Sequence, residues 1–155
     1  MFVDKSEMTE AFWEDVKRSV PDAGNNYRAR RASGNPDFAE IIMNLIITEK
    51  KRGLFGLQLL QERQPELAPT LGGVLVLVDF AGIPQGAVKT TKITPVPYKD
   101  INEGHLAVEG PDARKLRTWQ DIHWPYWTQM LAPYGLTPNT DMIVIIEQFK
   151  LIYPT

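Results

Sequence analysis

Apolar residues recur three and four positions apart in the first part of the chain, which is the spacing of an amphipathic helix. A first helix is expected at Ser6–Val20, with Ser6 or Thr9 as its N-cap and acidic residues in its first turn. The apolar stripe of this helix consists of Phe12, Trp13, Val16 and Val20. Pro21 and the Gly24-Asn25-Asn26 stretch end it.

Two further helices follow from the same spacing. Asn35-Pro36-Asp37 supplies an N-cap residue, a first-turn proline and an acid, and predicts a helix that ends near Thr48. Its apolar positions, expected to form one core-facing side, are Phe38, Ile41, Ile42, Leu45 and Ile46. A third helix is expected at about Asp112–Ala132, with a kink at Pro125. One side of it carries Leu116, Trp119, Ile122, His123, Tyr126 and Trp127.

Shorter apolar runs with β-branched residues predict strands. Val74–Phe80 is continuously apolar at first, which indicates a strand buried on both faces. A turn at Ala81–Gln85 leads to a second strand at Gly86–Ile93, and the two form a hairpin. The last strand is expected at Met142–Tyr153. Gly53–Leu60 stays ambiguous, since it fits a strand that turns into a helical turn.

The remaining segments are predicted to be irregular. Tyr27–Gly34 is expected to be a connector rich in arginine, and Gln61–Gly73 a loop because it contains two prolines and a Gly-Gly pair. Helices first, then a hairpin, a helix and a closing strand indicate one α+β domain over residues 1–155. Its natural architecture is a small curled β-barrel or sheet flanked by helices.

Composition narrows the possible functions. The 155-residue chain has a formal net charge of -2, so any affinity for nucleic acid must come from a local patch. It contains no cysteine, which excludes disulfides and thiolate chemistry and suits a reducing cytoplasm. The start of the chain lacks the pattern of a signal peptide, and the apolar runs are too short to span a bilayer. We therefore expect a cytoplasmic protein without membrane contact.

The most informative feature is a run of three cations, Lys50, Lys51 and Arg52, at the end of the second predicted helix. The unpaired carbonyls of a helix end favour positive charge, but this explains one cation more readily than three. The surplus predicts a site for an anion. Arg30 and Arg31, in the connector, are either solvated arginines or converge with this run on one ligand.

The order of these motifs resembles the bacterial ASCH domain proteins of the PUA-like superfamily. The resemblance covers nearly the whole chain, from Phe12 to Pro154. It rests on Asn35–Glu40, Thr48–Arg52, Asp79–Pro84, Thr91–Ile93, Glu109-Gly110, Trp119, His123-Trp124, Asp141-Met142, Glu147–Phe149 and Ile152–Pro154. It implies a small β-barrel with a ligand cleft between barrel and helices, and RNA or a nucleotide-like anion as the partner.

Some relatives hydrolyse the acetyl amide of an acetylated cytidine, and at least one relative is a ribonuclease. The amidohydrolase pattern combines a helix-end lysine, a threonine three residues later and a glutamate before the third helix. The resemblance places the lysine on Lys51, the threonine on Leu54 and the glutamate on about Pro111, with Glu109 nearby. Two of the three catalytic positions are thus occupied by residues without the required group.

Three classes of function follow. A binding module for RNA would use Lys50, Lys51, Arg52, Arg30 and Arg31 for phosphate, with Tyr27, Trp119 or Trp124 as stacking platforms. The alternative for the tryptophans is packing in the core. A hydrolase would use Lys51 as base and Glu109 to orient water, without a local hydroxyl. A protein-interaction module, as in some eukaryotic relatives, has no exposed amphipathic stretch to support it.

Metal chemistry is not expected. The two histidines, His105 and His123, have no carboxylate at ligand spacing. His123 lies on the aromatic side of the third helix and fits a hydrogen-bonded core residue better than a ligand. We expect no cofactor, and the oligomeric state is left open by the sequence.

Overall fold

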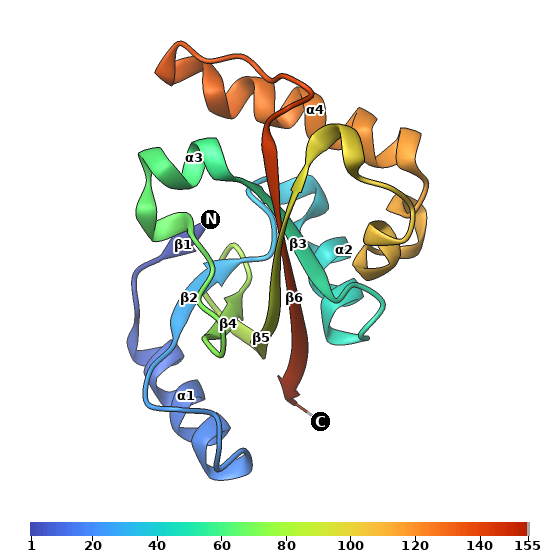
Figure 1. The fold of residues 1–155 in the computed structure, drawn as a ribbon. Helices are drawn as coiled ribbons and strands as arrows, with labels where there is room; N and C mark the ends of the chain where they lie inside the picture. The colour runs from blue at the N-terminus through green and yellow to red at the C-terminus, as the bar shows by residue number, and fades with distance from the viewer. Residues whose placement is uncertain (155) are drawn as a thin grey trace.

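The computed structural model of the protein describes residues 1–154, and a six-stranded mixed sheet forms its centre (Figure 1). The strands follow one another across the sheet in the order β1-β2-β4-β5-β6-β3. Their bounds are β1 Phe2–Val3, β2 Arg28–Arg31, β3 Gly53–Leu57, β4 Val74–Val78, β5 Pro84–Pro97 and β6 Ile143–Tyr153. Neighbouring strands are antiparallel except for β2 and β4, which run parallel.

The long strands β5 and β6 lie side by side and form the main strand pair of this sheet. They pair from Ala87 opposite Tyr153 to Pro97 opposite Ile143, with two register shifts on the way. Irregularities of this kind bend a strand and increase its twist. The sheet is open, with β1 at one end of the order and β3 at the other. The curled sheet flanked by helices is confirmed, and its strands do not close into a barrel.

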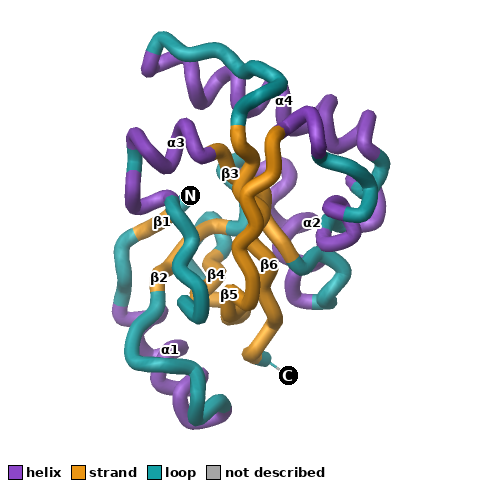
Figure 2. The backbone as a smooth tube through the Cα atoms, in the orientation of Figure 1, coloured by secondary structure: helices purple, strands orange, loops and turns teal. Residues whose placement is uncertain are grey.

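Four helices flank the sheet, with α1 near one end and α4 across the opposite end (Figures 1 and 2). Their bounds are α1 Glu7–Ser19, α2 Pro36–Ile47, α3 Gln58–Arg63 and α4 Leu116–Leu131. Ser6 caps α1 and Asn35 caps α2, as their sequences predict. α4 continues through Pro125. None of the helices in residues 1–154 is long and apolar enough to cross a membrane.

Three hydrophobic clusters pack on the sheet. One lies beside α1 and includes Trp13, Val16, Val74 and Val76. A second lies beneath α2 and includes Ile46, Leu75, Leu77 and Phe149. The largest lies under α4 and is rich in aromatic residues. Val74–Val78 alternates between the first two clusters, which confirms a strand buried on both faces.

Two segments differ from the expectation. Tyr27–Gly34 is not only a connector, because Arg28–Arg31 forms β2 and pairs with both β1 and β4. Its sequence, Arg-Ala-Arg-Arg, lacks the alternation of apolar and polar residues that usually marks a strand. Gln61–Gly73 is also not entirely a loop, since it holds the end of α3 and a short 3₁₀ turn at Pro65–Leu67. The ambiguous Gly53–Leu60 is a strand that passes directly into a helix, as one of its interpretations allowed.

Candidate functional site: a charged notch between two helices

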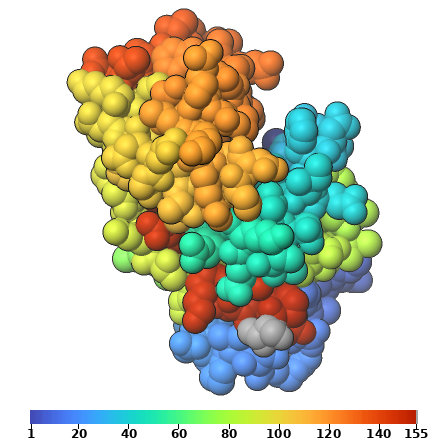
Figure 3. Space-filling view, turned by 90° about the vertical axis from the view of Figure 1, so that its right-hand side faces the viewer, coloured from blue at the N-terminus to red at the C-terminus, as the bar shows by residue number. Residues whose placement is uncertain are grey.

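A notch separates α4 from α2, and the space-filling view shows the start of the chain deep inside it (Figure 3). Four large apolar side chains on these helices keep between 48% and 59% of their surface exposed. They are Phe38 and Ile41 on α2, and Ile122 and Tyr126 on α4. Phe38 and Ile41 share one flank of α2 with Leu45, which lies against Gly110. We infer that the four side chains form the walls of the notch.

Backbone hydrogen bonds fix the position of Lys51 just after the C-terminal end of α2. The Lys51 N–H donates to the Leu45 carbonyl at 2.9 Å, and so satisfies one of the unpaired carbonyls at the helix end. The next residue, Arg52, donates its N–H to the Val108 carbonyl at 2.7 Å. Val108 precedes Glu109, so this bond brings the two charged residues together although 58 positions separate them.

The Lys51 ammonium and the Glu109 carboxylate form an ion pair that is almost fully buried, with 11% and 5% of their side chains exposed. The Arg114 guanidinium donates to the carbonyls of Glu109 and Lys50, both at 2.8 Å. These bonds connect the segment around Glu109 to the residue before Lys51. Burying two charges costs free energy that their attraction repays only with good geometry. A contribution to stability is therefore a weak explanation for this buried pair. A functional site that needs charges in fixed positions explains it better.

His123 on α4 lies beside this pair. Its ring stacks on Trp119, with 4.6 Å between the ring centroids, and its Nδ1 is 2.9 Å from the Trp119 carbonyl. A carbonyl only accepts, so Nδ1 carries the proton and Nε2 is left as an acceptor. Burial lowers the pKa of His123, while the Trp119 carbonyl and the Glu109 charge oppose this shift. His123 is therefore neutral at neutral pH, and it is a hydrogen-bonded residue packed among aromatic rings.

The lowered pKa of His123 predicts a pH-dependent stability. Below the ordinary histidine pKa of about 6.5, the unfolded chain binds this proton more readily than the folded chain. The free energy of unfolding should therefore fall as the pH drops from 7 towards 5, by at most about 1.4 kcal/mol per pH unit. Urea unfolding at a series of pH values measures this slope. It should become smaller in His123→Gln, and an equal slope in His123→Gln and the unchanged protein would contradict the assignment.

A second charged group lies on the sheet face under α2. Arg30 on β2 is half-buried, and burial lowers its pKa while the nearby Glu147 carboxylate on β6 raises it. Tyr126 of α4 is also close enough to raise the Arg30 pKa, so this guanidinium lies on the side of the sheet that faces α4. Glu147 is buried and accepts a 2.6 Å hydrogen bond from the Thr90 hydroxyl on β5. Arg30, Glu147 and Thr90 come from three strands, and we infer that they form the floor of the notch.

Leu54 stands directly opposite Glu147 in the β3–β6 register, and its side chain packs into the cluster beneath α2. Leu54, on which the resemblance places the threonine of the amidohydrolase pattern, is therefore an apolar residue packed in this cluster. Thr90 supplies a hydroxyl on the same face of the sheet, bonded to Glu147. Glu109, rather than Pro111, is the residue that contacts Lys51.

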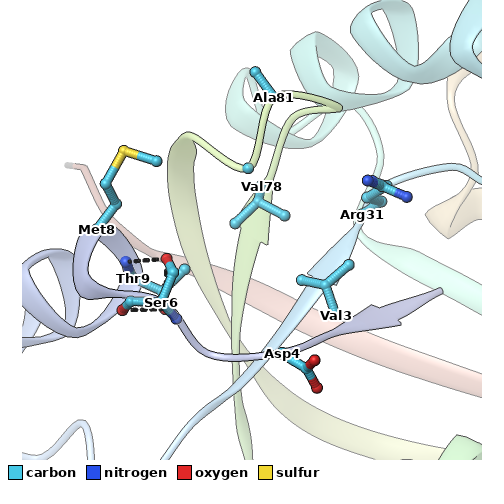
Figure 4. A pocket seen from close by; sticks show the side chains of 9 residues that line it. Val3, Asp4, Ser6, Met8, Thr9, Arg31, Val78 and Ala81 are labelled. Atoms are coloured by element: carbon cyan, nitrogen blue, oxygen red, sulfur yellow. Dashed lines mark hydrogen bonds between the residues drawn. The ribbon is translucent and has the colours of Figure 1, made fainter.

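Arg31 does not join this site. Successive residues of a strand point to opposite faces, so Arg31 lies on the side of the sheet opposite Arg30. It lines a small cavity of about 180 Å³ between β2, the β4–β5 turn and the start of α1 (Figure 4). Its guanidinium packs over the Phe80 ring at 4.4 Å. Arg30 and Arg31 thus lie on opposite faces of the sheet, so both cannot join Lys51 at one ligand, and the convergence with Lys51 stays a prediction for Arg30 alone.

The aromatic residues proposed from the sequence are not the ones that the notch exposes. Trp119 is fully buried in the cluster under α4, and Tyr27 is buried beneath α1, where its hydroxyl bonds to Thr9 and Glu10. Neither ring can stack on a base in this conformation. Phe38 and Tyr126 expose their rings instead. Both occupy apolar positions of predicted helices. The spacing of apolar residues fits burial in the core as well as exposure at a binding site, so the sequence does not distinguish the two.

The outer cations of the run are open to solvent at the C-terminal end of α2. Lys50 and Arg52 are exposed, and neither makes a salt bridge among the described residues. Arg28 is engaged elsewhere, since it donates to the Glu66 and Ala68 carbonyls. A larger groove of about 630 Å³ lies on the other flank of α2, against the β4–β5 turn, but its lining contains no lysine or arginine. Within residues 1–154 no group of three or more His, Asp or Glu side chains is placed to hold a metal ion.

Solved structures with a similar fold include the two that follow. The ASCH domain from Lactobacillus crispatus JV V101 matches with a TM-score of 0.87 and 24% identity, over 96% of both chains. Protein EF3133 from Enterococcus faecalis V583 matches with a TM-score of 0.78 and 20% identity, over 93% of this chain and 89% of that one. At these identities the likeness concerns the fold. No curated protein matches the sequence.

The family comparison agrees with the fold. The model of the ASCH domain matches residues 30–153, which begins at Arg30 on the notch floor and ends with β6. The matched region contains Lys51, Glu109 and Glu147. The chain therefore belongs to the ASCH domain family, whose fold is PUA-like.

Proposed function

We propose that the notch binds single-stranded RNA or a nucleotide. The observation that carries this proposal is the presence of two charged pairs beside α2 and α4, Lys51 with Glu109 and Arg30 near Glu147, whose members come from four separate segments of the chain. Two positive and two negative charges leave the inner part formally neutral. This favours a polar, uncharged group that needs both donors and acceptors, as a nucleobase does.

The rim of the notch has a different character. Lys50 and Arg52 add two exposed positive charges without carboxylate partners among the described residues, and such charges suit phosphate. Phe38 and Tyr126 provide aromatic surface on which a base can stack. A ligand with a planar heterocycle and a phosphate fits the two zones together, and this favours RNA or a nucleotide over a simple anion.

Binding of a labelled single-stranded RNA, followed by fluorescence anisotropy over a range of salt concentrations, tests the proposal. Lys50→Gln/Arg52→Gln should weaken binding and lower the slope of log K against log salt by about 1.4, since each lost phosphate contact on a single strand contributes about 0.7. Tyr126→Ala should cost about 1–3 kcal/mol of binding free energy by loss of stacking. Lys5→Ala, far from the notch in the fold, is the control. Equal effects of Lys5→Ala and the rim variants would remove the site.

A hydrolase acting on a modified nucleoside is the second candidate, and the contact between Lys51 and Glu109 favours it. The pair brings together the lysine of the pattern that some relatives use and a carboxylate two residues before the position of its glutamate. Leu54 has no hydroxyl to contribute, and the Thr90 hydroxyl is already bonded to Glu147. Release of acetate from acetylated cytidine separates the two candidates. Turnover that depends on Lys51 would establish the hydrolase, and its absence leaves the binding module.

A further inference from the structure

Three lysines lie together on the face of the sheet opposite the notch. Lys89 on β5 stands directly across from Lys150 on β6, and Lys92 stands across from Gln148 one step further along. Side chains that face each other in this way have Cβ atoms about 4.5–5.5 Å apart. Lys92 and Lys150 are exposed, and Lys89 is half-buried. We refer to Lys89, Lys92 and Lys150 as the lysine surface.

The neighbours of these lysines show which face they occupy. Lys89 pairs with Val74, whose side chain belongs to the cluster beside α1. The next residue, Thr90, points the other way and bonds to Glu147 at the notch. Lys150 likewise precedes Leu151 and follows Phe149, which both pack with the cluster beneath α2. The lysine surface is therefore separate from the notch, with the thickness of the sheet between them.

This arrangement is unfavourable unless something compensates it. Like charges directly opposite each other on neighbouring strands destabilise a sheet. Among the described residues, none of the three lysines forms a salt bridge. Lys89 has only a neutral partner, the Asp22 carbonyl at 2.8 Å. The chain as a whole carries a net charge of -2, so this concentration of positive charge is local.

We propose that the lysine surface is a second contact for the phosphate backbone of a nucleic acid whose other part occupies the notch, and this inference rests on the proposed function. Lysine ammonium groups act as point charges for phosphate. None of the exposed large apolar side chains belongs to the strand segments 89–92 and 148–150. A membrane surface or a protein partner would use such apolar anchors. A single strand that contacts both sites has to pass around the edge of the sheet, where β3 lies beside β6.

Two ligands and two sets of variants test this proposal. The ligands are adenosine monophosphate, which can fill only one site, and a single-stranded RNA of about 16 nucleotides, the upper end of what a small binding domain covers. Lys89→Gln/Lys150→Gln should weaken binding of the oligonucleotide several-fold and lower its salt slope by about 1.4. Binding of adenosine monophosphate should not change. Lys99→Gln/Lys115→Gln, which removes two exposed lysines elsewhere, is the matched control, and circular dichroism verifies the fold of each variant.

An unchanged salt slope in Lys89→Gln/Lys150→Gln would overturn the proposal, as would an equal loss in the control variant. Failure of the notch itself gives a different result. In that case Lys50→Gln/Arg52→Gln would leave the binding of both ligands unchanged, whether or not Lys89→Gln/Lys150→Gln weakens binding of the oligonucleotide. Weaker binding of the oligonucleotide together with unchanged binding of the mononucleotide supports the lysine surface as a separate backbone contact.

Discussion

Replacing Lys51 by methionine is expected to lower the free energy of unfolding by about 3–5 kcal/mol, because it leaves the Glu109 carboxylate buried without its partner. The methionine side chain keeps much of the lysine volume, so the loss reports on charge and not on a cavity. Urea unfolding followed by circular dichroism measures it. Since domains of this size have only about 5–15 kcal/mol of stability, the change is large.

The double variant Lys51→Met/Glu109→Leu is the decisive control. Removing both charges eliminates the cost of an unpaired one, so much of the lost stability should return. Lys99→Met breaks an exposed ion pair with Asp141 and should have little effect. If Lys51→Met were no worse than Lys99→Met, the buried pair would not exist in solution. If the double variant folds but no longer binds RNA, the charges serve the notch.

Replacing Trp119 by alanine is expected to cost about 3–5 kcal/mol, the range for truncating a large buried aromatic residue. Trp119 is fully buried and touches Phe55, Tyr98, His123 and Trp127 through aromatic contacts. Its loss would leave a cavity between β3 and α4. The midpoint of chemical unfolding should drop accordingly, and a change below about 1 kcal/mol would contradict the packing described here.

Trp119→Phe separates the role of the ring from that of the indole N–H. The indole nitrogen is buried and has no hydrogen-bond partner among the described residues, so losing the N–H breaks no bond within them. Trp119→Phe should therefore cost clearly less than Trp119→Ala. RNA binding by Trp119→Phe should remain close to that of the unchanged protein, since the ring does not reach the notch surface. A selective loss of binding would show that Trp119 contacts the ligand after all.

Much of the fold is readable from the sequence because local patterns reflect local structure. The caps at Ser6 and Asn35, and the apolar run that forms β4, each specify an element by themselves. β2 is the exception. Its Arg-Ala-Arg-Arg sequence becomes a strand because β1 and β4 supply hydrogen-bonding partners on both sides. The sequence of β2 itself does not indicate these partners.

The candidate site is readable only in part. Lys51 and its neighbours can be found because three consecutive cations exceed what a helix end needs. Phe38 and Tyr126 cannot be distinguished from core residues, since α2 and α4 carry apolar side chains on more than one side. Which side is buried depends on how the helices are placed on the sheet.

By itself, the sequence determined the α+β class, most of the elements, the cationic end of α2 and the resemblance to the ASCH family. The tertiary structure decided which of these residues meet. It paired Lys51 with Glu109, placed Arg30 and Arg31 on opposite faces, and moved Trp119 from a candidate binding residue into the core. The physical reason is that charge pairing and burial depend on contacts between segments far apart in the chain, whereas helix and strand periodicity reports only on near neighbours.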